Sequence, residues 1–340
     1  GLSYYPASFG DTQEIVEMAK VAAQFDVPLC AHLRSVLRKP DPAFDKRFEL
    51  LEIAKQSGVR AHFSHYRTTP ETAGRLDYLF EPIEQGLSKG LRITADFYPY
   101  AIGAGYCAVY LPLWAMDGGF SAIMYRLHDP ETRAKITHDL LWAWPPINNG
   151  VVIHAPKHPS YLGKSYAKIA EENKQTIAEM LTDLLEQEEL EAGFHHGYTY
   201  TEKQEKALDH DFPQILCMPY YMGSSDSIPA HMLPHPRSYG SFAKHCRLCY
   251  EQGIPLQTVA NRLSYSAARL FQLKDRGEIA EGKFADICLF KPEEFRDEAT
   301  FSNPVRFASG MKHVLVNGEF ALRDGNITGV RAGRALYRGK

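Results

Sequence analysis

Apolar and polar residues follow two different periods along the first part of the chain. Residues 11–25 (DTQEIVEMAKVAAQF) place apolar side chains at the i, i+3, i+4 and i+7 spacing of a helix with one buried face, and Asp11 can cap its first turn. The run 27–33 is short and mostly apolar, which predicts a buried strand. A helix over about 44–57 and a strand over 59–65 repeat this order.

A third unit follows, with a helix over about 71–89 and a strand over 91–97. The alternation of helices and strands then stops over a long segment. It resumes with an apolar strand at 215–223 and helices near 239–252 and 256–270. Strands that alternate with helices through short connections are typical of parallel βαβ units. The pattern therefore predicts an α/β fold with a parallel sheet and a large insertion.

The inserted and C-terminal segments have a different texture. The insertion contains a strand-like run at 150–156 and an amphipathic helix near 164–188, and we expect it to form a lobe beside the main body. Short alternating runs near the C-terminus are punctuated by Gly-Lys, Asn-Gly and Asp-Gly, which are hairpin signals. We expect four parts: 1–100 (start of the α/β body), 101–205 (inserted lobe), 206–274 (end of the body) and 275–340 (a small β domain).

Composition narrows the class of partner and the compartment. The 340 residues carry 38 basic and 41 acidic side chains, a net charge of −3, which argues against nucleic acid or an anionic membrane as the main partner. No run approaches the roughly 18 apolar residues of a membrane span. Six cysteines lack a framework of short spacings, which indicates reduced thiols in a cytoplasmic protein. Cys246 and Cys249 form a CxxC without a second pair, and we expect them to be structural.

Three candidate metal ligands stand at the ends of predicted strands. His32 and His65 end two neighbouring strands, and Asp226 follows a third. The carboxyl ends of the strands of a parallel barrel converge on one face, where active sites lie. Imidazole nitrogens and a carboxylate are ligands that catalytic zinc prefers. His62 points to the opposite face of its strand from His65 and is expected to be structural or to support the site.

Candidate substrate contacts lie close to the same strand ends. Tyr98 follows the third strand, in the segment DFYPY, and can offer a hydroxyl to a substrate, although packing is an equal alternative. Arg34 and Arg67 each stand two residues beyond a candidate ligand, and a surface ion pair is the alternative for both. Arg67 is the better candidate for a carboxylate, because a guanidinium binds it through two parallel hydrogen bonds. Arg237, in the segment HPRSYG, is a weaker candidate.

These segments together resemble the N-acyl-D-amino-acid deacylases (D-aminoacylases) of the amidohydrolase superfamily. The matching segments, in the family's order, are GLSYYP (1–6), AHLRS (31–35), AHFSHYR (61–67), TADFYPY (94–100), LPLWAMDGG (111–119), GSSDS (223–227), HPRSYGSF (235–242), DRGEIAEGKFADICLF (275–290) and VLVNGE (314–319). The ordered set extends over nearly the whole chain and is more specific than any one of its members.

The resemblance implies a (β/α)₈ TIM-type barrel and a β-sandwich built by both ends of the chain. It makes His32 and His65 the metal ligands of the fifth and sixth strands. Asp226 becomes the catalytic aspartate of the eighth strand, which can also touch the metal. Arg67 and Tyr98 fall where the family holds the substrate's carboxylate, and many members have Lys at the position of Arg67.

The resemblance also implies that part of the family's site is not in this chain. The family's first-strand His-x-His pair and its metal-bridging Cys would lie upstream of Gly1. We therefore expect a partial (β/α)₈ barrel with an inserted lobe and a C-terminal portion of the β-sandwich. The cofactor expected is one or two Zn²⁺ ions, with the remaining ligands upstream. The segment AIGAGY (101–106) replaces a Ser/Thr pair of the family, a difference that bears on substrate preference.

The predicted function is zinc-dependent hydrolysis of the amide bond of N-acyl-D-amino acids, which releases a carboxylate and a D-amino acid. Zinc held by His32 and His65 would polarise the acyl carbonyl, Asp226 would transfer the proton, and Arg67, Tyr98 and Arg237 would bind the α-carboxylate. One alternative is another amidohydrolase reaction, such as the opening of a cyclic amide by a dihydroorotase or hydantoinase. The other is a truncated, non-catalytic paralogue that acts as a binding protein.

Overall fold

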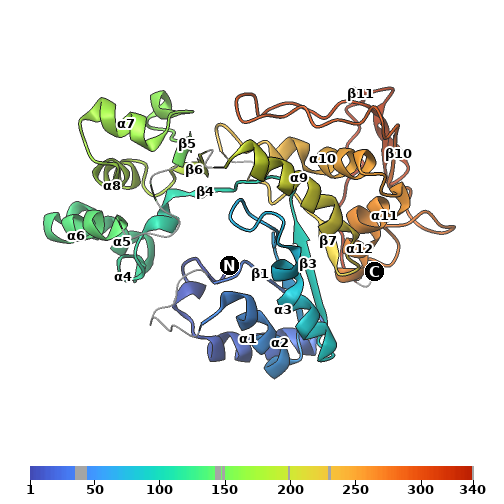
Figure 1. The fold of residues 1–340 in the computed structure, drawn as a ribbon, viewed down its shortest axis with the longest axis horizontal. Helices are drawn as coiled ribbons and strands as arrows, with labels where there is room; N and C mark the ends of the chain where they lie inside the picture. The colour runs from blue at the N-terminus through green and yellow to red at the C-terminus, as the bar shows by residue number, and fades with distance from the viewer. Residues whose placement is uncertain (35–43, 142–146, 148–149, 198–199, 229–230, 339–340) are drawn as a thin grey trace.

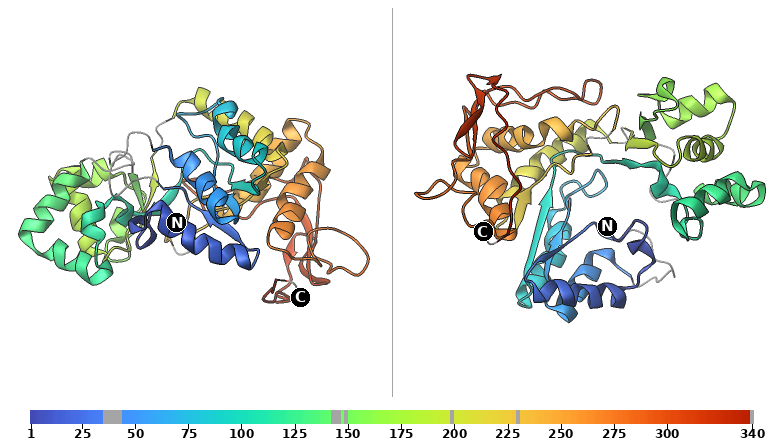
Figure 2. Two further views of the ribbon diagram at one scale, coloured as in Figure 1. Left: turned by 90° about the horizontal axis from the view of Figure 1, so that it is seen from below. Right: turned by 180° about the vertical axis from the view of Figure 1, so that it is seen from behind.

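A computed structural model describes residues 1–34, 44–141, 147, 150–197, 200–228 and 231–338. The described chain forms a body with a parallel sheet, a lobe with its own small sheet, and a C-terminal antiparallel sheet (Figure 1). The lobe and the C-terminal sheet lie at opposite ends of the body in all views (Figures 1 and 2). None of the described helices is long and apolar enough to cross a membrane.

Helices and strands alternate through the body, as the sequence pattern predicts. The helices are α1 (Thr12–Gln24), α2 (Lys46–Ser57), α3 (Leu76–Ser88), α4 (Leu113–Met116), α5 (Gly119–His128), α6 (Pro130–Leu140), α7 (Tyr166–Asn173), α8 (Ile177–Gln187), α9 (Glu202–Cys217), α10 (Arg237–Glu251), α11 (Leu256–Ala260) and α12 (Ser266–Leu270). Single 3₁₀ turns are η1 (Ala7–Phe9), η2 (Cys107–Tyr110) and η4 (Pro159–Tyr161), and a π-helical turn, η5 (Asn261–Tyr265), joins α11 to α12.

The strands form three sheets. They are β1 (Pro28–Ala31), β2 (Arg60–Phe63), β3 (Ile93–Phe97), β4 (Ala104–Tyr106), β5 (Gly150–His154), β6 (Gly193–His196), β7 (Tyr221–Gly223), β8 (Ile287–Phe290), β9 (Met311–Val316), β10 (Glu319–Arg323) and β11 (Asn326–Ile327). The body sheet has the order β1-β2-β3-β7 with parallel neighbours. The lobe sheet (β4-β6-β5) and the C-terminal sheet (β11-β10-β9-β8) are antiparallel.

The parallel βαβ units are confirmed, and the described strands form an open sheet with β1 and β7 at its edges. Local capping chemistry sets the helix ends. Asp11 accepts a hydrogen bond from the Glu14 N–H at the start of α1, at 2.8 Å. Gly58 ends α2 in the left-handed conformation, with φ of 71°, which glycine adopts without a steric penalty.

Three boundaries differ from the sequence pattern. Helix α9 continues to Cys217, so only the last part of the apolar run 215–223 is a strand. The run predicted as one helix at 164–188 is two helices, because Lys174 adopts a left-handed conformation and Thr176 caps α8 with a capping box. Helix α3 starts at Leu76, five residues later than the pattern suggests.

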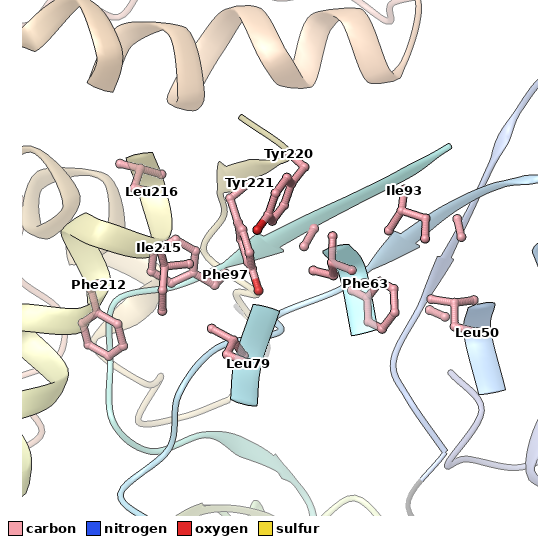
Figure 3. Close-up of a cluster of buried hydrophobic side chains, with 14 of the residues drawn as sticks. Leu50, Phe63, Leu79, Ile93, Phe97, Phe212, Ile215, Leu216, Tyr220 and Tyr221 are labelled. Atoms are coloured by element: carbon pink, nitrogen blue, oxygen red, sulfur yellow. The ribbon is translucent and has the colours of Figure 1, made fainter. Parts of the chain in front are cut away.

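Two separate hydrophobic clusters hold the body and the lobe. In the body, Phe63, Phe97 and Tyr221 come from three adjacent strands and are fully buried against α2, α3 and α9 (Figure 3). In the lobe, the cluster surrounds Tyr166 and Phe194, and it includes buried side chains of α5, α6 and α8. The lobe therefore has a core of its own, and its sheet is attached to the end of β3 through β4.

The C-terminal sheet is a meander with tight turns. Asn317 and Gly318 connect β9 to β10 with φ values of 52° and 86°, and Asp324 and Gly325 connect β10 to β11 with 49° and 76°. Positive φ at both central residues is what a two-residue hairpin with a type I′ turn requires. The hairpins expected from Asn-Gly and Asp-Gly are confirmed.

The loop that follows β7 docks on the lobe sheet. Tyr106, Gly193 and His154 stand side by side across β4, β6 and β5, and the bare glycine leaves a notch between its two larger neighbours. His231 fills this notch: it is 4% exposed, and a Cβ on Gly193 would lie 2.8 Å from its Nε2. The Met232 N–H donates to His154 Nδ1 at 3.2 Å. The loop is thereby fixed to the lobe.

Candidate active site

His32 and His65 meet at one edge of the body sheet. His32 follows β1 and His65 follows β2, and because these strands are parallel neighbours, both side chains emerge at the same edge. His32 Nδ1 lies 2.8 Å from His65 Nε2, and the ring centroids are 4.5 Å apart. The structure therefore places these two predicted ligands in direct contact.

Both imidazoles are held neutral. Burial lowers the pKa of His32 to about 3, with the neighbouring His65 adding to the effect and the Asp226 carboxylate opposing it. Burial also lowers the pKa of His65 to about 4, although Asp96 opposes the shift. A neutral imidazole carries a free electron pair on one ring nitrogen, which is the form that binds metal ions. The donor chemistry of the pair fits zinc.

Asp226 faces an arginine in this structure. It follows β7 with φ of 47°, a left-handed conformation that is unusual for a residue other than glycine. Its Oδ2 forms an ion pair with Arg237 Nη1 at 2.8 Å, and its side chain is 37% exposed. Burial raises the pKa of this carboxyl, while the Arg237 guanidinium acts in the opposite direction. Among the described residues, no three His, Cys, Asp or Glu side chains form a group that could hold a metal ion.

Tyr98 lies against two guanidinium groups. It is 5% exposed, and its ring centroid lies 4.3 Å from Arg67 Cζ and 4.5 Å from Arg237 Cζ. A guanidinium at this distance is attracted to the negative face of an aromatic ring. The three predicted substrate contacts, Arg67, Tyr98 and Arg237, are therefore one cluster next to Asp226.

The two arginines of this cluster have N–H groups that are only weakly bonded or have no partner among the described residues. Arg67 Nη2 donates to the Ala101 carbonyl and Arg237 Nη2 to the Ala104 carbonyl, both at the long distance of 3.5 Å. The Nε atoms of both arginines are buried and have no hydrogen-bond partner in the described part of the chain. With two guanidinium groups and the single carboxylate of Asp226, the cluster favours an anionic ligand.

The backbone at Gly103 passes close to the side chains of Tyr98 and Arg237. A Cβ on Gly103 would lie 3.1 Å from the Tyr98 hydroxyl and 4.0 Å from Arg237 Nη1. His235, two residues before Arg237, is 3% exposed: its Nε2 lies 3.1 Å from the Ile102 carbonyl, and its Nδ1 accepts the Arg237 N–H at 3.0 Å. His235 therefore orients the start of α10.

Arg34 does not belong to this cluster. Its Nε donates to both carboxylate oxygens of Glu49 on α2, at 3.0 and 3.1 Å, and both side chains are 2% exposed. Thr12 on α1 donates a further hydrogen bond to Glu49 at 3.0 Å. The ion pair considered for Arg34 from the sequence is present, but it is buried and ties the segment after β1 to two helices.

Two further residues beside the histidine pair are not evident from the sequence pattern. The Tyr4 hydroxyl lies 2.7 Å from His32 Nδ1, and burial raises the pKa of Tyr4 to about 12, so the hydroxyl keeps its proton. Asp96 accepts the backbone N–H of His65 at 2.9 Å. Both lie in segments that match the family, GLSYYP and TADFYPY, and this is the signal by which they could be found.

The CxxC lies within α10, away from these residues. Cys246 and Cys249 are buried, and burial raises the pKa of each thiol to about 12. All six cysteines are unpaired. Buried, protonated thiols are inert toward metals and oxidants, in agreement with a structural role.

Comparison with known proteins supplies relatives along nearly the whole chain, although no family model matches it. An N-acyl-D-glutamate deacylase of Alcaligenes xylosoxydans xylosoxydans is 26% identical over 324 residues, which cover 94% of this chain and 56% of the relative. A D-aminoacylase of the same organism is 24% identical over 341 residues, which cover 99% of this chain and 60% of the relative. The chain thus spans less than two thirds of the length of these relatives.

Solved structures share the fold. A D-aminoacylase described as defining a novel subset of amidohydrolases matches with a TM-score of 0.75 at 23% identity, over 99% of this chain and 62% of that one. An N-acyl-D-glutamate deacylase from Bordetella bronchiseptica, complexed with zinc and a phosphonate inhibitor, matches with a TM-score of 0.72 at 23% identity, over 96% of this chain and 61% of that one. These matches confirm the resemblance identified from the sequence motifs.

Proposed function

Because the chain is a relative of the N-acyl-D-amino-acid deacylases, we propose that it hydrolyses the amide bond of N-acyl-D-amino acids and releases a carboxylate and a D-amino acid. The observation that carries the proposal is the contact between two neutral imidazoles, His32 and His65, at the ends of adjacent parallel strands. Two imidazoles on one edge are part of the donor set of a hydrolytic zinc site.

The proposed metal ligands are His32 and His65, for one or two zinc ions, together with Asp226. In this structure the Asp226 carboxylate is paired with Arg237 and is not grouped with the two histidines. The Bordetella bronchiseptica deacylase shares the fold and is complexed with zinc, which supports this choice of metal. A zinc ion bound there would supply Lewis acidity toward the acyl carbonyl and would lower the pKa of a water molecule to about 7.

Asp226 is proposed to transfer the proton. Its Oδ2 lies 2.8 Å from Arg237 Nη1, and its carboxylate accepts no hydrogen bond from any other described side chain. A carboxylate in this position takes a proton from the attacking water and delivers it to the nitrogen of the departing amine. Burial, which raises the pKa of this carboxyl, makes it a better proton acceptor than an exposed aspartate.

Arg67, Tyr98 and Arg237 are proposed to bind the α-carboxylate of the substrate. Each arginine has a buried Nε without a partner among the described residues, and the two guanidinium groups outnumber the single carboxylate of Asp226. Tyr98 lies against both and keeps their planes in place. A carboxylate fixed beside the reacting carbonyl also sets the stereochemistry that the site accepts.

We also propose how the whole chain is organised around this site. We infer that the body sheet belongs to a (β/α)₈ barrel, built by 1–100 and 206–274, with 101–205 as an inserted lobe and 275–340 as part of a β-sandwich. The parallel order β1-β2-β3-β7 supports this inference. The partner is a small molecule and not a nucleic acid or membrane, and the unpaired cysteines favour a cytoplasmic location.

The test uses the full-length protein, with its zinc content measured and hydrolysis assayed on N-acetyl derivatives of D- and L-amino acids. Replacement of the proton-transfer group, Asp226→Asn, is expected to abolish turnover and leave zinc largely bound. Asp324→Asn, which changes an aspartate 77% exposed in the C-terminal sheet, is the matched control and should remain active. Turnover of Asp226→Asn close to that of Asp324→Asn would exclude the proposed role of Asp226.

The same assay separates the alternatives. Opening of cyclic amides, such as hydantoins and dihydropyrimidines, without hydrolysis of N-acetyl-D-amino acids would assign the site to the other amidohydrolase reaction. A full-length protein without stoichiometric zinc and without either activity would identify a non-catalytic binding protein.

A further inference from the structure

Asp96 joins the ends of three strands through its side chain. It lies on β3, between β2 and β7, and its side chain is 19% exposed. Its Oδ1 accepts the His65 N–H at 2.9 Å and the Ser224 hydroxyl at 2.6 Å, and its Oδ2 lies 2.7 Å from His62 Nε2. Two of the three donors come from the β2 side and one from the β7 side.

The network continues behind Asp96, from His62 to Thr94. If His62 Nε2–H donates to Asp96, then His62 Nδ1 accepts the hydroxyl of Thr94, which lies 2.7 Å away. The Asp96 side chain thus receives hydrogen bonds from three donors, and a carboxylate forms stronger hydrogen bonds than a neutral acceptor.

The backbone on both sides of Asp96 is in a conformation that needs support. His65 has φ of 41° and Asp226 has φ of 47°, and this left-handed region is sterically unfavourable for a residue other than glycine. The Tyr66 N–H donates to the Asp96 carbonyl, and the Ser224 N–H to the carbonyl of the next residue along β3, both at 2.8 Å. The end of β3 therefore binds both turns, through side chain and main chain.

We propose that Asp96 is a positioning residue of the active site, which holds the His65 turn and, through Ser224, the turn that carries Asp226. This role rests on the proposed function, in which His65 binds zinc and Asp226 transfers the proton. The hydrogen-bond partners of the Asp96 side chain are His62, the His65 N–H and Ser224. Asp96 acts by keeping a ligand side chain and the proton-transfer group aimed at the same place.

The two arms of the network can be cut separately. Asp96→Asn turns an acceptor oxygen into an NH₂ group, so that at least one of the three donors loses its partner and the charge is lost. Ser224→Ala removes only the arm toward Asp226. Thr94→Val removes the far end of the network, behind His62, and leaves all three hydrogen bonds of Asp96 in place, which makes it the matched control.

The experiment measures zinc affinity, kcat and KM of the three full-length variants, together with their thermal unfolding. For Asp96→Asn we expect kcat and zinc affinity each to fall by about 10–100-fold, with KM little changed, because loss of a group that orients ligands has effects of this size. Ser224→Ala should lower kcat by roughly 5–10-fold and leave zinc affinity unchanged, since one hydrogen bond contributes about 1 kcal/mol. Thr94→Val should keep the kcat and zinc affinity of the wild type, and any loss of stability measures the lost partner of His62 Nδ1.

A purely structural role predicts a different result. Asp96→Asn would then unfold at a lower temperature, but its folded molecules would bind zinc and turn over substrate like Thr94→Val, and this outcome would overturn the proposal. If Asp96→Asn does not fold, Ser224→Ala decides: a normal kcat rejects the positioning role. A crystal structure of Asp96→Asn or Ser224→Ala gives a readout independent of activity, because a shifted turn at His65 or Asp226 supports the proposal and unmoved turns contradict it. If the wild-type protein itself binds no zinc and hydrolyses no substrate, this result rejects the proposed function and not the positioning of the two turns by Asp96.

Discussion

The buried ion pair between Arg34 and Glu49 gives a direct test of how the segment after β1 is held. Arg34 stands two residues beyond His32, and its Nε contacts both oxygens of Glu49 at 3.0 and 3.1 Å. Its Nη1 donates weakly to the Ser8 carbonyl at 3.4 Å, and its Nη2 is buried without a hydrogen-bond partner among the described residues. Glu49→Gln keeps the shape of the side chain and removes its charge.

The expected cost follows from the burial of both partners. Each side chain is 2% exposed, so a guanidinium without its carboxylate remains in a medium that solvates it poorly. Loss of one member of a buried ion pair costs about 3–5 kcal/mol, and we expect about 3 kcal/mol here because glutamine still accepts one hydrogen bond. The double variant Arg34→Met/Glu49→Leu removes both charges and should cost less than Glu49→Gln alone.

The assay is urea unfolding, with the free energy of unfolding obtained by linear extrapolation. The matched control is Glu171→Gln, which breaks the exposed pair of Glu171 with Lys168, 3.2 Å apart with side chains 75% and 55% exposed. An exposed pair contributes at most about 1 kcal/mol. Equal losses for Glu49→Gln and Glu171→Gln would refute the reasoning, as would a double variant less stable than Glu49→Gln.

Two further predictions follow from buried groups near the sheet. Burial lowers the pKa of His245, which packs on Phe97, to about 3, so its neutral form stabilises the fold fully above pH 6.5 and progressively less as pH falls toward 3. Between pH 7.5 and 5.5 the wild type should lose about 1.4 kcal/mol more than His245→Gln in urea unfolding, and equal losses would contradict this. A side chain at position 103 would enter the space beside the Tyr98 hydroxyl, 3.1 Å from a Cβ. Gly103→Val should therefore raise KM for N-acyl-D-amino acids with large side chains more than for N-acetyl-D-alanine, and a uniform change would argue against a substrate in this space.

The sequence predicts the parts of the fold that depend on local chemistry. The ends of α1 and α2 lie within two residues of the prediction, because Asp11 and Gly58 act within one turn of their own helices. The apolar run at 215–223 is only partly a strand, since a short apolar run does not distinguish the end of a buried helix from a strand. Thr176 and Glu179 form a capping box that the periodicity of the surrounding helix conceals.

Within the site, the contact of the two histidines can be predicted from the order of the strands. The residues around them cannot, because their positions depend on how distant segments pack. Residues that end adjacent parallel strands must share an edge, so the contact of His32 with His65 follows from the order of the strands. The contact of Tyr4 with His32 spans 28 residues and that of Asp96 with the His65 N–H spans 31, and both depend on how segments pack, which no local pattern encodes. The ionic partner of Arg34 is also hidden, because Glu49 reads as a surface position of α2.

The notch above Gly193 has a consequence for the order in which the protein folds. The row of Tyr106, Gly193 and His154 exists only after three strands of the lobe have paired, and His231 has no place to lie before then. His231 and Met232 are therefore bound to a surface that is built by strands distant from them in the sequence. We therefore expect the segment at His231 to be fixed only after the lobe sheet has formed.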